Sequence, residues 1–121
     1  MITGKIISAA FKVHSTLGPG LLESSYKECM HYVMTKDGIF VEKEKPLPLI
    51  FEEVRLEIGY RLDLFVERKV VVECKAIEAL TDVHTAQVLT YLKLTGNKLG
   101  FLVNFNSASI KDRESLFRII N

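Results

Sequence analysis

The sequence predicts one α/β domain in which a mixed β-sheet is flanked by helices. Three observations support this class: apolar residues recur at helical spacing early in the chain, alternating strand patterns follow, and a capped helix separates the later strands. A chain of 121 residues has room for one core, so we interpret residues 1–121 as a single domain.

The first two elements are predicted to be helices. Ile6, Ala10 and Val13 recur at helical spacing, and Gly18-Pro19-Gly20 ends that segment. A second helix is expected over about Leu21–Lys36, because it carries another apolar stripe.

From residue 39 onward the pattern changes to strands. A first strand, irregular or at a sheet edge, is expected between Val41 and Phe51, because Pro46 and Pro48 cannot donate to a ladder. Alternation then predicts a β-hairpin whose strands are Tyr60–Val66 and Val70–Ala76.

The last third of the chain predicts a helix and two strands. Thr81 can cap a helix that runs to about Leu94 and ends at Gly96. Alternating apolar residues over 99–105 and the segment Leu116–Ile120 predict the final strands. The expected element order is α-α-β-β-β-α-β-β.

Composition and charge narrow the class of protein. Apolar residues make up 48% and charged residues 26%, which is typical of folded globular domains and excludes disordered or fibrous chains. The 16 Lys and Arg residues almost balance the 15 Asp and Glu residues, giving a formal net charge of +1. No strong overall field therefore attracts nucleic acid or membranes, and a nucleic-acid role needs a local patch or a metal.

Cysteine usage and hydropathy suggest a cellular location. Cys29 and Cys74 are too few for a disulfide framework, so we expect reduced thiols. The apolar runs are too short to span a bilayer, and the first residues do not resemble a secretory signal. We expect a cytoplasmic protein with no membrane partner.

The hairpin carries the most informative charged residues. If its loop is the odd-numbered segment Glu67–Lys69, Asp63 lies opposite Glu73 and their carboxylates share one face. Opposed Cβ atoms lie roughly 4.5–5.5 Å apart, which lets two carboxylates hold one divalent cation. Lys75 would point to the same face, because it follows Glu73 by two residues.

Two alternatives remain open for this hairpin. A two-residue loop would shift the register and separate the acids. A solvated, salt-bridged face is also the more common reason for charged residues to alternate in an antiparallel pair.

Several motifs together resemble a known family. Gly20, Glu23 and Tyr26 have the spacing G-x-x-E-x-x-Y after which the GxxExxY family is named. Asp63 followed by Glu73-Cys74-Lys75 resembles the acidic core of the PD-(D/E)XK nuclease superfamily, to which that family is similar. The resemblance covers nearly the whole chain, although a leucine stands where the superfamily's name-giving proline would be.

The resemblance implies a fold and an activity. The fold would be restriction-endonuclease-like, with an αβββαβ core and an extra N-terminal helix. The activity would be hydrolysis of phosphodiester bonds in DNA or RNA with Mg²⁺ or Mn²⁺. Asp63 and Glu73 would then be metal ligands, Glu23 would complete the metal shell or orient water, and Lys75 would act on the attacking water.

The resemblance assigns supporting roles to Gln87 and Tyr91, in the active site or on phosphate. Reasoning from the residues alone leaves other roles equally open. Tyr91 also suits a core aromatic, Gln87 a surface amide, and Glu23 a charge that complements a helix N-terminus. Tyr26 and His14 are expected to be structural.

A function from another class also fits the sequence. The domain could be a non-catalytic binding or assembly module that retains the nuclease-like fold. The neutral charge balance implies either weak nucleic-acid affinity or a groove built by a homodimer, and a branched-DNA resolvase would also need a dimer.

Overall fold

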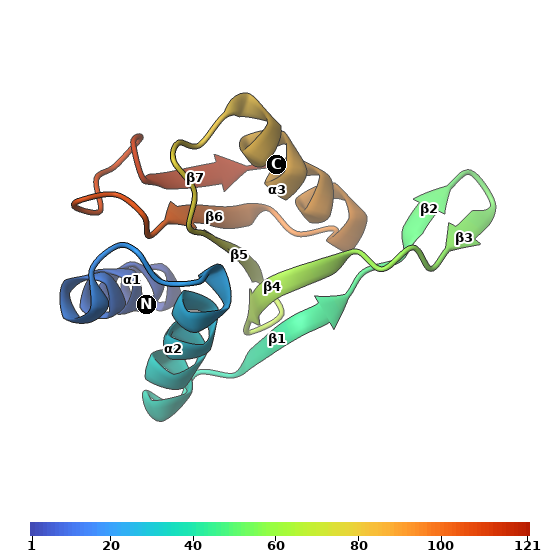
Figure 1. The fold of residues 1–121 in the computed structure, drawn as a ribbon. Coiled ribbons are helices and arrows are strands. Elements are labelled where there is room, and N and C mark those ends of the chain that lie inside the picture. Colours follow the sequence, from blue (N-terminus) through green and yellow to red (C-terminus); the bar gives the residue numbers. More distant parts are fainter.

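The computed structural model describes all residues, 1–121, as three helices and seven strands (Figure 1). The helices are α1 (Ile2–Leu17), α2 (Glu23–Lys36) and α3 (Asp82–Thr95). The strands are β1 (Val41–Pro46), β2 (Leu49–Phe51), β3 (Val54–Leu56), β4 (Arg61–Val66), β5 (Val70–Lys75), β6 (Leu99–Asn104) and β7 (Leu116–Ile120).

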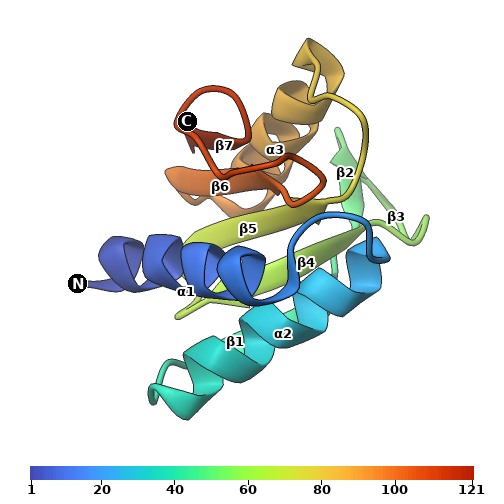
Figure 2. The same cartoon turned by 60° about the vertical axis from the view of Figure 1, so that its left-hand side comes forward.

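Five of the strands form one mixed sheet in the order β1-β4-β5-β6-β7. β5 and β6 are parallel and α3 connects them, while the other neighbouring strands are antiparallel. Helices α1 and α2 cover one face of the sheet and α3 covers the other (Figures 1 and 2). The predicted class, a mixed sheet flanked by helices, is confirmed.

The two faces of the sheet pack into two separate cores. Val72 on β5 belongs to the same core cluster as Ala10 of α1 and Met30 of α2, whereas its neighbour Val71 belongs to the cluster that contains Leu92 of α3. Successive strand residues point to opposite faces, so one apolar run on β5 can supply both cores.

The break between the first two helices is confirmed, although α2 starts later than expected. Gly18 and Gly20 both adopt positive φ, at 66° and 103°, a region that side chains disfavour. The chain is still extended at Leu22, so α2 begins at Glu23 and not at Leu21. Glu23 therefore occupies the first turn of α2.

The single strand expected between Val41 and Phe51 was wrong. The chain leaves the main sheet after Pro46 and forms a separate two-stranded hairpin from β2 and β3, which extends away from the body (Figure 1). Its two-residue turn begins with Glu52 at a φ of 55°. That turn contains none of the Asn or Gly residues that usually mark such hairpins, so the pattern did not predict it.

The later elements agree with the prediction. Thr81 precedes α3, and its backbone N–H donates to His84 Nδ1 at 2.9 Å. Gly96 ends this helix in the left-handed conformation at a φ of 73°. No helix has the combination of length and apolar character that crossing a bilayer requires.

Candidate active site at strands β4 and β5

The hairpin between β4 and β5 has the register on which the predicted site depends. Val66 pairs with Val70 across a three-residue loop, and the ladder continues to Leu64 opposite Val72. Asp63 and Glu73 occupy the next position on the two strands. The predicted juxtaposition of the two acids is therefore present.

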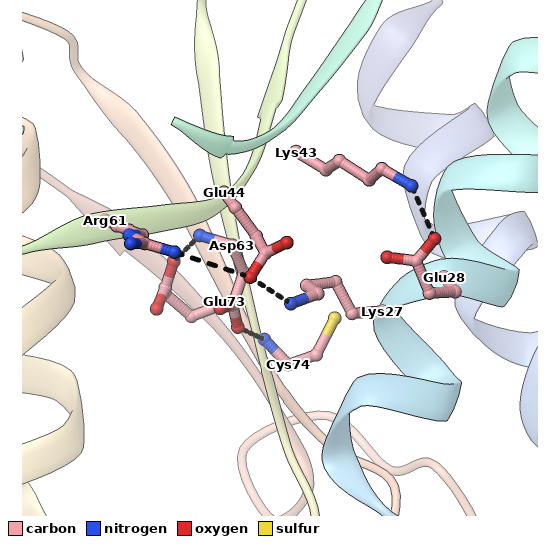
Figure 3. Close-up of polar contacts among 8 residues, drawn as sticks. All are labelled: Lys27, Glu28, Lys43, Glu44, Arg61, Asp63, Glu73 and Cys74. Carbon is pink, nitrogen blue, oxygen red and sulfur yellow. Dashed lines mark hydrogen bonds and ion pairs between the residues drawn. The ribbon is translucent and has the colours of Figure 1, made fainter. Parts of the chain in front are cut away.

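At this position, side chains replace the backbone ladder. The backbone N–H of Asp63 donates to Glu73 Oε2 at 2.8 Å, and the N–H of Cys74 donates to Asp63 Oδ2 at 2.9 Å (Figure 3). Each carboxylate therefore binds the backbone of the opposite strand. Neither acid forms an ion pair with a lysine or arginine, so this part of the hairpin is not a salt-bridged face.

The side-chain alternation of strand β4 is interrupted at Asp63, so that the residues on either side of it face opposite sides of the sheet. Leu62 packs under α3, whereas Leu64 packs under α1 and α2, although residues two apart share a face in a regular strand. β1 is irregular at the same level, because Glu44 has a φ of 52° and its pair with Asp63 is missing between two regular pairs. The regular alternation expected for this strand is therefore interrupted at the acid.

Burial and mutual repulsion disfavour the charged forms of both acids. Glu73 is only 3% exposed, and burial, followed by the nearby charge of Asp63, raises its pKa to about 8. Burial also raises the pKa of Asp63, against the hydrogen bond from Cys74. A protein rarely keeps two adjacent carboxylates in this condition without a use for them.

Glu23 and Lys27 face Asp63 across a cavity of ≈ 340 Å³ at the start of α2. The charge of Glu23 contributes to the raised pKa of Asp63, after burial. Lys27 lies one turn after Glu23 on the same helix face, and its ammonium pairs with Glu44 at 3.2 Å (Figure 3). Sequence reasoning missed Lys27, although this four-residue spacing could have indicated it.

Lys75 ends strand β5 beside the acid pair. Its side chain is half-buried and makes no ion pair, and its positive charge lowers the pKa of both Asp63 and Glu73. The backbone behind it is fixed, since Phe105 donates its N–H to the Lys75 carbonyl at 2.8 Å. The Asn104 side chain also binds the N–H and carbonyl of Ile77.

Gln87 and Tyr91 lie on α3, on the opposite face of the sheet from α2. Tyr91 is 5% exposed, and burial raises the pKa of its hydroxyl, as do the charges of Glu73 and Asp63. Both residues line a cavity of ≈ 170 Å³ together with Tyr60. His84, on the same helix face, has a structural use as the partner of Thr81 at the start of α3.

Two other polar residues have structural roles, as expected. The Tyr26 hydroxyl donates to the Gly18 carbonyl at 2.6 Å and accepts from the N–H of Leu21 at 3.1 Å. The Tyr26 ring stacks on Phe105 at 4.6 Å between centroids. His14 is almost buried, with Nε2 at 2.7 Å from the Ser107 carbonyl.

The acid pair has the chemistry that a hard cation requires. One oxygen of each carboxylate accepts a backbone N–H, and the other oxygen makes no hydrogen bond. No buried side-chain oxygen lacks a partner, so these second oxygens keep some accessible surface. Asp63 and Glu73 therefore offer the oxygen donors that suit a hard divalent cation. No group of three or more His, Cys, Asp or Glu side chains is placed to hold a metal ion, so Glu23 does not join Asp63 and Glu73 as a third ligand in this structure.

Comparison with known proteins gives one match. A protein-family model described as the PD-(D/E)XK nuclease superfamily matches residues 1–117. The search of curated proteins found no match. The search of solved structures also found none.

Proposed function

The chain belongs to the PD-(D/E)XK nuclease superfamily, and we propose that it is a nuclease that hydrolyses phosphodiester bonds in DNA or RNA with Mg²⁺ or Mn²⁺. The observation that carries this proposal is the pair of reciprocal hydrogen bonds between β4 and β5 at Asp63 and Glu73. These bonds fix the direction of two carboxylates that would otherwise rotate freely. They support a preorganised pair of anionic ligands beside a lysine.

Asp63 and Glu73 would hold the cation through the oxygens that make no hydrogen bond. When bound, Mg²⁺ polarises a phosphoryl oxygen and lowers the pKa of a coordinated water. The protein keeps both carboxylates in place through backbone N–H groups, so binding the cation requires little reorganisation. Their raised pKa values also mean that the cation must compete with protons.

Lys75 and Glu23 would act on the water and the phosphate from two sides. The Lys75 ammonium has no ion-pair partner, so it can donate to the attacking water or to a phosphoryl oxygen that gains charge. Glu23 shares the α2 cavity with Asp63 and can orient a water there. Lys27 lines the same cavity and can offset phosphate charge.

Gln87 and Tyr91 would brace the acid pair from the α3 side. Tyr91 packs in the same core cluster as Leu62, the residue before Asp63. The Gln87 side chain contacts the Tyr91 hydroxyl and lowers its pKa, against burial. Gln87 and Tyr91 lie one helical turn apart and line the same cavity, so the amide can help to hold the tyrosine ring in place.

A cleavage assay with isosteric variants tests the proposal. Asp63→Asn and Glu73→Gln remove a charge but keep an oxygen that can accept the same backbone N–H, so the hairpin should stay folded. With single-stranded and duplex DNA and with RNA, we expect Mg²⁺-dependent cleavage that EDTA stops and that falls at least about 100-fold in both variants and in Lys75→Ala.

The matched control is Glu57→Gln. Glu57 is an exposed acid that directly follows β3, and its only ion pair is with Arg55. This variant should cleave as the wild type does. Cleavage that survives in Asp63→Asn or Lys75→Ala would indicate a contaminating nuclease. Calorimetric titration of Mn²⁺ gives an independent readout, and equal heats for wild type and Asp63→Asn would remove the metal site.

One observation favours the alternative, a non-catalytic binding module. Leu49, Phe51, Val54 and Leu56 alternate onto one face of the β2–β3 hairpin, and most of that apolar face is exposed. Absence of cleavage on every substrate, with the fold and Mn²⁺ binding intact, would support this alternative over the nuclease.

A further inference from the structure

A small cavity lies between α3 and the chain that leads into β4. It holds ≈ 170 Å³. This volume is well below the roughly 300–1,000 Å³ of pockets that take drug-sized ligands, so it suits one ring system. The cavity is lined by Leu49, Tyr60, Gln87, Thr90, Tyr91 and Leu94.

The lining of this cavity combines apolar surface with uncharged polar groups. Two tyrosine rings and two leucines offer surface for a flat, apolar ligand, while Gln87 and Thr90 offer an amide and a hydroxyl for its edge. Thr90 donates its own proton to the Ala86 carbonyl at 3.0 Å, so its oxygen remains free to accept. A nucleobase has this combination of an aromatic face and a hydrogen-bonding edge.

No charged residue lines the cavity, which decides against phosphate as its ligand. Phosphate oxygens in protein sites are met by lysine, arginine or backbone N–H groups. The cavity therefore selects an uncharged part of a nucleotide. With a net charge of only +1, the chain also gains little from backbone attraction, so a base contact would add affinity that charge does not supply.

The cavity lies next to the proposed catalytic acids. Tyr60 precedes Asp63 by three residues, which places their Cα atoms no more than about 10 Å apart along the strand. On the other wall, Tyr91 belongs to the same core cluster as Leu62, the residue before Asp63. A base held in the cavity would keep its own phosphate beside Asp63 and Glu73.

Tyr60 is available for such a contact. Its side chain is 43% exposed and makes no hydrogen bond, whereas its backbone carbonyl accepts the N–H of Leu47 at 2.8 Å. The position of the residue is thus fixed by the backbone, and the ring is free to stack on a ligand. A substitution of this ring should leave the fold intact.

We propose that the cavity between Tyr60 and α3 binds one unstacked nucleobase, so that the preferred substrate is a single-stranded or locally opened nucleic acid. The proposal rests on the nuclease function proposed above and specifies its substrate class. In a closed duplex, every base is stacked and paired, and none can enter a cavity of this size without being extruded.

A binding assay in the Asp63→Asn background tests this without cleavage. The probes are a short fluorescein-labelled thymidine oligomer and an abasic oligomer of the same length, which has the same phosphates but no bases. The protein should bind the thymidine oligomer roughly 5- to 150-fold more tightly, as expected for stacking of one base. Tyr60→Ala should abolish this preference and Tyr60→Phe, which keeps the ring, should retain it.

The matched control is Tyr32→Ala, which removes a tyrosine that is 62% exposed on α2, outside this cavity. This variant should keep the full preference. Equal affinity for the two oligomers, no binding of either, or an unchanged preference in Tyr60→Ala would overturn the base-binding cavity. A preference that Tyr60→Ala removes, in a protein whose wild type cleaves nothing with Mg²⁺, would support the cavity and overturn the nuclease.

Discussion

Asp63 and Glu73 each contribute both to the fold of the hairpin and to the proposed site. The carboxylates of Asp63 and Glu73 accept the backbone N–H groups that a regular ladder would have paired. Their charge is costly where it lies, since Glu73 is almost completely buried. The metal-free protein therefore has to keep a proton on this pair or lose stability.

The first prediction concerns the pH dependence of stability without metal. The pKa of Glu73 is raised to about 8 in the folded chain, from 4.5, so the folded state holds this proton more tightly than the unfolded state. The contribution of Glu73 to stability should be full below pH 4.5, should fall between pH 4.5 and 8 by at most about 1.4 kcal/mol per pH unit, and should level off above pH 8. Urea unfolding in EDTA at a series of pH values measures this.

Glu73→Gln should flatten most of this dependence, because glutamine does not ionise and can still accept the N–H of Asp63. Some dependence should remain, since the pKa of Asp63 is also raised. The exposed variant Glu57→Gln should behave as the wild type. A Glu73→Gln protein that loses stability as steeply as the wild type would contradict the prediction.

At the scale of secondary-structure elements, the β2–β3 hairpin differs from the rest of the chain. None of its residues belongs to either of the two core clusters, although Leu47, just before β2, is buried in the cluster under α3. A two-stranded hairpin is marginally stable by itself in water. Its side chains should therefore contribute little to the stability of the domain.

The second prediction compares two phenylalanines on this basis. Phe51 on β2 is 65% exposed, and Phe51→Ala should change the free energy of unfolding by less than about 0.5 kcal/mol. Phe101 on β6 is 1% exposed, and Phe101→Ala should cost about 3–5 kcal/mol because it leaves a cavity. Urea titration of both variants gives the comparison. Similar losses in the two would mean that the hairpin packs on the body.

Regular periodicity explains which elements could be predicted from the sequence. The apolar stripes of α1 and α2, the Thr81 and Gly96 signals of α3 and the odd-numbered loop before Val70 all act locally, so the sequence alone indicates them. The β2–β3 hairpin was missed, because Glu52 adopts a positive φ that glycine or asparagine usually provides.

The candidate site was predictable only in part, for a similar reason. The register of the hairpin follows from loop length, which is why Asp63 and Glu73 could be placed together. The interruption of β4 at Asp63 depends on the irregular partner residue Glu44 on β1, far away in sequence. The positions of Lys27 and Tyr60 likewise depend on how α2 and α3 pack against the sheet.

At the scale of the whole molecule, residues from the helices on both faces of the sheet lie beside the same part of the β4–β5 hairpin. Helix α2 presents Glu23 and Lys27 from one face, and α3 presents Gln87 and Tyr91 from the other. The acid pair lies between them because the alternation of β4 is interrupted there. One small domain can in this way combine residues from two layers at the proposed site, although its net charge is close to zero.

The third prediction links cation binding to the stability of the whole domain. A cation that binds the folded chain and not the unfolded one stabilises it by about 2.7 kcal/mol at a hundred times the dissociation constant. Since the raised pKa values of Asp63 and Glu73 make protons compete for the same oxygens, Mg²⁺ should raise the melting temperature more at pH 8 than at pH 5. Thermal unfolding with Mg²⁺ and with EDTA measures both effects.

In Asp63→Asn the stabilisation should disappear at either pH, because one of the two ligands has lost its charge. If Mg²⁺ stabilised this variant as much as the wild type, the ion would be binding elsewhere on the domain, and the acid pair would have to be explained by the fold alone.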